Sequence, residues 1–146
     1  MCIEGYARFD VPDFVYQVRL YRNGAFCPAI RFDIAAKNLD IPMQQLGHTY
    51  VAKRIKLFVD ANPWGFGYRQ YLSGFHCCTS LADARYVLFV FGCSFADYLE
   101  RKGYKLVIVK ARPTKKRRCI TGVQTFGAQV LPIVVAPELT YLEFAE

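Results

Sequence analysis

The sequence has no C-x-x-C motif, only two histidines, and no apolar run that reaches the roughly 18 residues of a membrane-spanning helix. These absences argue against a metal centre with closely spaced ligands and against a membrane span. A hydrophobic leader is also missing, and the adjacent pair Cys77 and Cys78 suits no ordinary disulfide framework. We therefore expect the six cysteines to be reduced thiols in a cytosolic compartment.

The composition is that of one folded domain. Hydrophobic residues make up 53% of the 146 positions and aromatic residues 16%, which excludes disorder and favours a strand-rich interior. The length fits a single domain over 1–146, in which 1–13 is an N-terminal arm or a short edge strand. A net charge of +7 gives a surface that attracts nucleic acid, an anionic membrane or an acidic protein.

The first half of the chain predicts a hairpin followed by an irregular crossover. Residues 14–21 alternate with the period of two of a strand that has one mostly polar face. Asn23-Gly24 is a strong turn signal, and 26–32 returns as a second strand. A short helix and irregular structure are expected within 33–63, with a strand over 51–59 and a loop over 62–68.

The segment 74–85 predicts a strand that runs into a capped helix. Ser80 is the expected N-cap, because its hydroxyl can accept from the amide of Asp83. Residues 86–91 suit either a helix or a strand, because they are bulky or β-branched. A break at Gly92 and Cys93 is expected, followed by a second helix over 95–102 that Gly103 ends.

The last third predicts four strands, over 105–110, 117–123, 130–135 and 139–144. Turn signals separate them at Pro113-Thr114, Phe126-Gly127 and Ala136-Pro137. The whole pattern indicates a compact α+β domain, mainly antiparallel sheet with a central helical segment.

Few residues have the pattern of a reactive site. His76, at a strand end before a helix, fits a general base, a donor that orients a ligand, or a buried histidine bonded to the backbone. Cys78 fits either a thiol activated by the helix N-terminus or a packing residue. The only dense basic run predicts contacts with a polyanion, and the opposite interpretation is a solvated loop. Its cations and their neighbours are Lys110, Arg112, Lys115, Lys116, Arg117 and Arg118.

Four segments together resemble a small uncharacterised domain of bacteriophages and large DNA viruses. They are Val15-Tyr16-Gln17-Val18-Arg19, the Gly-Phe-His segment that runs through Cys77-Cys78-Thr79-Ser80 into Leu81-Ala82-Asp83-Ala84, the strand 105–110, and 134–142. The hallmark of that domain is a Gly-Phe-His segment before a helix that starts Leu-x-Asp-Ala. The resemblance covers about 14–143 and implies a viral origin rather than a reaction.

A second, weaker similarity is to ADP-ribosyltransferases of the arginine, Ser-Thr-Ser, glutamate type. It implies a ligand site at Arg19 or Arg22, Thr79 and Ser80, with Glu138 or Glu143 as the late glutamate. His76, singled out above by its own position, completes the expected set of ligand-binding residues. The chain departs from that pattern, because Cys78 replaces the first serine and no E-x-E or Q-x-E precedes a late strand. A derelict transferase-like scaffold therefore fits better than a working enzyme, with His76 and Glu138 as the catalytic candidates.

Two classes of function follow. The preferred one is a viral or phage protein that acts as a binding or structural module, capsid-associated or host-interacting, through its basic, aromatic-rich surface. Its expected partner is another viral or host protein, or nucleic acid at the basic run, in the host cytoplasm or the virion. The alternative is an ADP-ribosyltransferase-like or nucleotide-binding enzyme with a pocket at Arg19, His76, Thr79 and Glu138. Because no complete catalytic set is present, the first class is preferred and no cofactor is expected.

Overall fold

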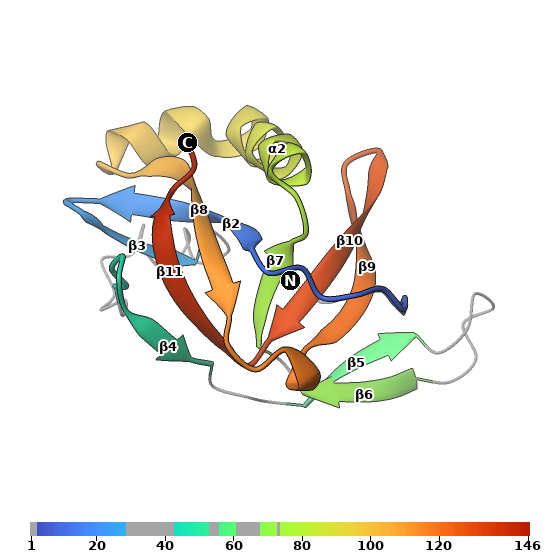
Figure 1. The fold of residues 1–146 in the computed structure, drawn as a ribbon. Coiled ribbons are helices and arrows are strands. Elements are labelled where there is room, and N and C mark those ends of the chain that lie inside the picture. The colour runs from blue at the N-terminus through green and yellow to red at the C-terminus, as the bar shows by residue number, and fades with distance from the viewer. Residues whose placement is uncertain (1–2, 29–42, 53–55, 61–67, 73) are drawn as a thin grey trace.

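The computed structural model describes residues 3–28, 43–52, 56–60, 68–72 and 74–146. In this part of the chain nine strands form one antiparallel sheet, two more form a separate hairpin, and one α-helix packs on the sheet (Figure 1). The sheet order is β1-β9-β10-β7-β2-β8-β11-β4, with β3 paired to β2. The prediction of a compact, mainly antiparallel domain with a central helical segment is confirmed.

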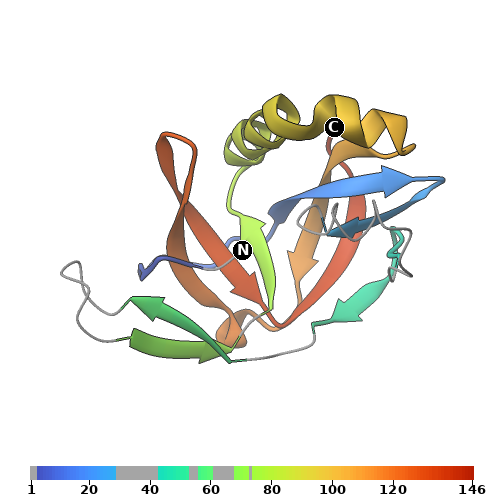
Figure 2. The ribbon, with the colours of Figure 1, turned by 180° about the vertical axis from the view of Figure 1, so that it is seen from behind.

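The elements have the following bounds: β1 Gly5–Tyr6, β2 Val15–Arg22, β3 Ala25–Pro28, β4 Thr49–Val51, β5 Lys56–Asp60, β6 Tyr68–Leu72, β7 Phe75–Cys78, α2 Leu81–Arg101, β8 Lys105–Pro113, the 3-10 turn η2 Lys116–Arg118, β9 Ile120–Phe126, β10 Gln129–Ala136 and β11 Glu138–Phe144. Seen from behind, the β5-β6 hairpin lies on the side of the molecule opposite to α2 (Figure 2).

Strand β2 lies at the centre of the sheet. It pairs with β8 over seven residues, with β7 at Tyr16, and with β3 through the predicted turn at Asn23 and Gly24. Both turn residues have positive φ, 51° and 82°, as a tight hairpin requires. The face of β2 that the sequence marks as polar does not point to solvent, because Gln17 and Arg19 are only 5% and 4% exposed. The side chains of Phe26 and Tyr141 cover this face of β2, so Gln17 and Arg19 are buried beneath them.

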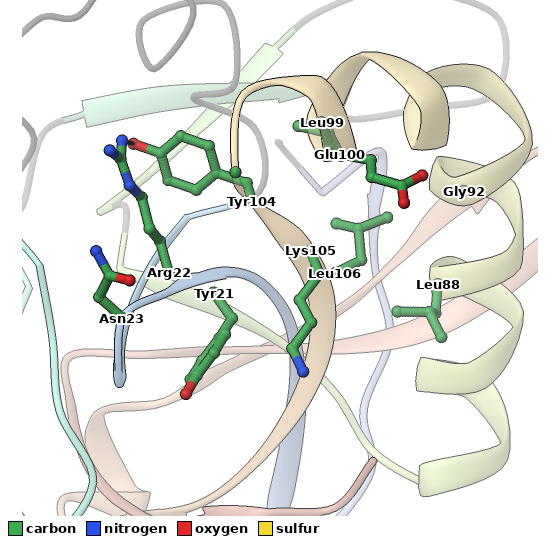
Figure 3. A pocket seen from close by; sticks show the side chains of 11 residues that line it. Tyr21, Arg22, Asn23, Leu88, Gly92, Leu99, Glu100, Tyr104, Lys105 and Leu106 are labelled. Carbon is green, nitrogen blue, oxygen red and sulfur yellow. Dashed lines mark hydrogen bonds between the residues drawn. The ribbon is translucent and has the colours of Figure 1, made fainter.

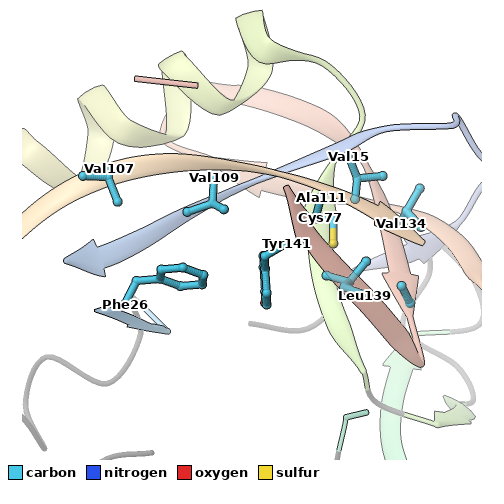
Figure 4. Close-up of a cluster of buried hydrophobic side chains, with 10 residues drawn as sticks. Val15, Phe26, Cys77, Val107, Val109, Ala111, Val134, Leu139 and Tyr141 are labelled. Atoms are coloured by element: carbon cyan, nitrogen blue, oxygen red, sulfur yellow. The ribbon is translucent and has the colours of Figure 1, made fainter. Parts of the chain in front are cut away.

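Helix α2 covers one face of the sheet, and a second core fills the other. Cys78, Ala84, Val87 and Ile108 belong to the core between α2 and the sheet. Tyr141 lies in the core on the opposite face (Figure 4). The other labelled members of that core are Val15, Phe26, Cys77, Val107, Val109, Ala111, Val134 and Leu139. The two faces of the sheet therefore hold separate sets of side chains.

The helical segment is one helix and not two. The predicted cap at Ser80 is confirmed by its Oγ, which accepts from the amide of Asp83 at 3.1 Å. The predicted end at Gly103 is confirmed too: its amide donates to Glu100 and that of Tyr104 donates to Leu99, and Gly103 has a φ of +79°. The predicted break at Gly92 is wrong, because caps at both ends and apolar packing outweigh one mid-helix glycine. No helix in the described ranges has the length and apolar character to cross a membrane.

Gly92→Ala is expected to raise the free energy of unfolding by about 1 kcal/mol. A glycine inside a helix is about that much less favourable than alanine, and a Cβ at Gly92 would meet no atom within 4 Å. The change is measured as a higher urea midpoint with an unchanged slope. Gly24→Ala is the matched control: its Cβ would also meet nothing, but its φ of +82° should make the substitution destabilising. Equal effects at the two positions would contradict the prediction.

The other predicted strands are present in the described residues, but some of them begin or end at different residues than predicted. The strand expected over 117–123 begins later, at Ile120, because Lys116–Arg118 form a 3-10 turn. The strand expected over 51–59 is two strands, β4 and β5, separated by a segment that includes 53–55, which lie outside the described residues. The short helix near 35–37, the second half of 26–32 and most of the loop 62–68 also lie outside the described residues.

Candidate polyanion-binding site

The basic run forms part of a hollow where β8 ends. Pro113 is the last residue of β8, and η2 turns the chain back toward β9. The turn is fixed by two backbone hydrogen bonds, from the amide of Arg118 to Lys115 at 3.0 Å and from that of Cys119 to Lys116 at 3.1 Å. The hollow has a volume of about 880 Å³ and is lined by Asp13, Phe14, Arg112, Pro113, Thr114, Lys115, Lys116, Arg117 and Arg118. Five of the six predicted polyanion-binding residues thus line one concavity.

Phe14 brings an aromatic ring into this basic hollow. The β2-β8 register pairs Val15 with Ala111, so Phe14 emerges beside Lys110 and Arg112. The Lys110 Nζ lies 4.2 Å from the ring centroid and the Arg112 Cζ lies 5.6 Å from it. Phe14 as a whole residue is 36% exposed. Lys110, the sixth predicted cation, is therefore held next to the hollow through this ring.

Half of the six cations have carboxylate partners. Lys116 pairs with Asp13, which lowers the pKa of that carboxyl through the hydrogen bond and the charge of Lys116. Lys115 lies 3.4 Å from Glu138, and Lys110 lies 3.6 Å from Glu143. Arg112, Arg117 and Arg118 make no ion pair within the described residues, and all three are exposed. The hollow therefore keeps three guanidinium groups that make no ion pair with the described residues, although the charge of Arg112 also acts on the nearby Asp13 carboxylate.

Arg19, the first of the other predicted ligand residues, is buried on the face opposite to α2. Its guanidinium lies 5.6 Å from the ring centroid of Phe26 and 5.5 Å from that of Tyr141, and its Nη2 donates to Gln44 Oε1. Its Nε has no hydrogen-bond partner among the described residues. Burial lowers the pKa of Arg19. Two aromatic faces and one amide thus hold this cation, without a carboxylate from the described residues.

His76 lies on the other face of the sheet. It pairs in register with Val135, a member of the core beneath α2, whereas the neighbouring Cys77 belongs to the core around Tyr141. The His76 Nδ1 lies 3.2 Å from the carbonyl oxygen of Gly74, to which the Nδ1–H tautomer donates. Burial lowers the pKa of His76 to about 4, so the ring is neutral at pH 7. Arg19 and His76 are consequently separated by the sheet.

The remaining candidates lie in three further places. Ser80 caps α2, and Thr79 precedes it at the end of β7. Arg22 lies at the far end of β2, where its guanidinium stacks 5.2 Å from the Tyr104 ring. Glu138 pairs with Lys115 at the edge of the basic hollow. The structure thus does not gather Arg19, His76, Thr79 and Glu138 around one point.

The adjacent cysteines Cys77 and Cys78 are buried and are not activated as nucleophiles. Burial raises the pKa of the Cys78 thiol to about 12 and that of Cys77 well above its ordinary value. The alternative of an activated thiol at Cys78 is therefore wrong, because the loss of hydration outweighs the adjacent helix N-terminus. Among the described residues no disulfide forms and no three His, Cys, Asp or Glu side chains cluster as metal ligands.

Phe14 is the residue of the site that sequence reasoning did not assign to it. Its position in an alternating apolar pattern predicts a core residue, and no aromatic interleaves with the basic run itself. One feature of the sequence could have indicated that Phe14 is exposed: it directly follows Pro12 and Asp13, just before the strand begins. A scan against protein-family models, a search of curated proteins and a search of solved structures each find no match to this chain.

Proposed function

We propose that this chain is a non-enzymatic binding module that holds a phosphodiester chain in the basic hollow. The observation that carries the proposal is the hollow itself, in which three guanidinium groups without described ion-pair partners line the same concavity as the partly exposed Phe14. Guanidinium groups bind phosphates with two parallel hydrogen bonds, and an exposed ring stacks on unpaired bases. Single-stranded nucleic acid supplies both groups, so it fits this surface better than an acidic protein segment, which supplies only negative charge.

A viral or phage origin remains part of the proposal, because it rests on the resemblance of the Gly-Phe-His segment. In that setting the module is capsid-associated or interacts with a host component, in the host cytoplasm or the virion. We also infer the α+β class, since the single described helix packs on one face of an antiparallel sheet.

The alternative, an ADP-ribosyltransferase-like or nucleotide-binding enzyme, has less support. It needs Arg19, His76, Thr79 and Glu138 around a common pocket, whereas Arg19 and His76 belong to opposite faces of the sheet. Glu138 already has Lys115 as a partner. Stabilisation by nicotinamide dinucleotide that survives about 0.3 M salt and disappears in Arg19→Ala would favour the enzyme.

The proposal is tested with a triple variant, Arg112→Gln, Arg117→Gln and Arg118→Gln. Binding of a labelled single-stranded oligonucleotide is followed by fluorescence anisotropy at several salt concentrations. The triple variant should bind roughly 100-fold more weakly, if each contact contributes about 1 kcal/mol. Its slope of log K against log salt should fall by about 2, because three counterion-releasing contacts are lost.

A control triple removes the same charge elsewhere. Arg22, Lys102 and Lys105 lie at the opposite end of the β2-β8 pair, and Arg22→Gln, Lys102→Gln and Lys105→Gln should leave affinity within about twofold of the parent. Phe14→Leu should weaken single-stranded binding about tenfold and leave binding of a duplex of equal length unchanged. Equal losses in both triples, or tighter binding of a polyglutamate peptide than of the oligonucleotide, would overturn the proposal.

A further inference from the structure

The basic hollow contains one acid of its own, and this acid is paired with one of the cations. Asp13 is the only acidic residue among the described residues that line the hollow. Its carboxylate accepts a hydrogen bond from the Lys116 ammonium and forms an ion pair with it. The charge of Arg112 also acts on this carboxylate. An internal anion therefore lies among the cations to which the phosphodiester chain would bind.

The register of β2 and β8 brings Asp13 to this position. Val15, at the start of β2, pairs with Ala111, two residues before the end of β8. Asp13 precedes Val15 by two residues, so it lies where β8 ends and the chain turns toward Lys116. The side chain of Asp13 is 81% exposed and that of Lys116 is 43% exposed. Because exposed ion pairs contribute little to stability, this pair can open at a small cost.

A hollow at the opposite end of the β2-β8 pair shows that an acid and a cation in one concavity do not always pair. This hollow has a volume of about 690 Å³, and both Arg22 and Glu100 line it. The Arg22 guanidinium lies 5.2 Å from the ring centroid of Tyr104 and forms no ion pair within the described part of the chain (Figure 3). The pairing of Asp13 with Lys116 is therefore a consequence of where the two strand ends place these residues.

We propose that Asp13 is an internal competitor of the phosphodiester chain: it holds Lys116 in the free protein, and a phosphate group must displace it to reach Lys116. This inference rests on the proposed function of the hollow. Arg112, Arg117 and Arg118 make no ion pair with the described residues, so they are available to the ligand at once. At Lys116, by contrast, one ion pair replaces another, so this lysine adds little net affinity while Asp13 is present.

The first test is Asp13→Asn, measured with the labelled single-stranded oligonucleotide by fluorescence anisotropy. The variant should bind about fivefold more tightly than the parent, because Lys116 no longer has to give up an ion pair. Asp10→Asn is the matched control. It removes the same charge from the same N-terminal arm, but Asp10 does not line the hollow, so affinity should stay within about twofold of the parent.

Lys116→Gln separates competition from a general effect of charge. In the parent, this substitution should change affinity by less than about twofold, because the gain at Lys116 is offset by the loss of its pair with Asp13. In the Asp13→Asn background, the same substitution should remove the whole fivefold gain. Asp13→Asn that tightens binding equally with and without Lys116 would overturn the inference, since Asp13 would then act only through its charge.

The outcomes also separate this inference from the proposed function. A parent that binds the oligonucleotide and loses affinity in the arginine triple variant, but is unaffected by Asp13→Asn, would overturn the competition and leave the binding site intact. A parent that does not bind the oligonucleotide would overturn both. Unfolding midpoints of the Asp13 and Lys116 variants check that each protein is folded, and an exposed pair should change them little.

Discussion

Tyr141→Ala is expected to lower the free energy of unfolding by about 4 kcal/mol, the usual cost of removing a large buried aromatic side chain. Tyr141 is fully buried and makes an edge contact with Phe26 at a centroid distance of 4.9 Å. Its hydroxyl donates to Gln17 Oε1 at 2.8 Å, and its ring faces the buried Arg19 guanidinium. The substitution leaves a cavity, an unsatisfied amide oxygen and a less shielded buried cation together. Urea unfolding at pH 7 measures the loss.

Tyr141→Phe separates the packing of Tyr141 from its hydrogen bond. The ring stays, and only the donor to Gln17 is removed, so the expected cost is about 1 to 2 kcal/mol. This variant also remains measurable if the alanine variant is unfolded, because a domain of this kind has only about 5 to 15 kcal/mol of stability. A phenylalanine variant as unstable as the alanine variant would contradict the assignment of most of the effect to packing.

Acidification from pH 6.5 to 4 is expected to cost up to about 3 kcal/mol of stability through His76 alone. Burial lowers the folded-state pKa of this ring from 6.5 to about 4. In that interval the unfolded chain binds a proton that the folded chain does not, so stability is complete above about pH 6.5 and falls as the pH falls. The window of about 2.5 pH units at 1.36 kcal/mol each gives the magnitude. Unfolding midpoints measured across this range test it.

His76→Asn is the variant that isolates this effect. Its side-chain amide keeps a donor for the carbonyl of Gly74 but does not titrate, so the stability of the variant should change less between pH 6.5 and 4 than that of the parent. His48→Asn, at the exposed second histidine, is the matched control substitution. A His76→Asn variant with the full pH dependence of the parent would show that carboxyl groups, rather than His76, set the acid limit.

Local signals predicted most of the secondary structure. Ser80 and Gly103 mark the ends of α2 because a capping hydroxyl and a positive φ act within a few residues. Gly92 misled the prediction, since whether a mid-helix glycine ends a helix depends on packing that no local pattern contains. The burial of Gln17 and Arg19 was missed for the same reason: the neighbours of β2 come from β7 and β8, which lie far away in the sequence.

For the candidate sites too, local signals in the sequence were sufficient for one prediction, and long-range contacts decided the others. Five of the predicted cations are contiguous or nearly so, and a turn was enough to bring them together around one hollow. The proposed enzyme pocket depended on which face of a strand each residue occupies. Tyr16 of β2 pairs with Cys78 of β7, so these two side chains lie on the same face of the sheet. Because side chains alternate between the faces along each strand, Arg19 and His76 lie on opposite faces. Phe14 reaches the basic hollow only through the β2-β8 register.

The Gly-Phe-His segment has a structural explanation. A Cβ at Gly74 would lie 2.5 Å from the carbonyl oxygen of Ala136, so only glycine allows the chain to pass this close to the end of β10. Phe75 packs against the core around Tyr141, and the ring of His76 is within hydrogen-bond distance of the Gly74 carbonyl. All three residues thus have packing roles at the point where the chain enters the sheet before α2.

The position of β2 at the middle of the sheet also determines when this chain can fold. Its main partner β8 follows about 90 residues later in the sequence. The short β1 pairs with β9, which follows it at an even greater distance along the chain. During synthesis β2 therefore emerges long before any strand that can flank it except β3, and its apolar side chains stay exposed until α2 and β8 have left the ribosome. Such non-local pairing slows folding relative to a helical protein of equal size. Early protection of the β2-β3 hairpin, by a chaperone or by contacts of its own, would be most valuable in that interval.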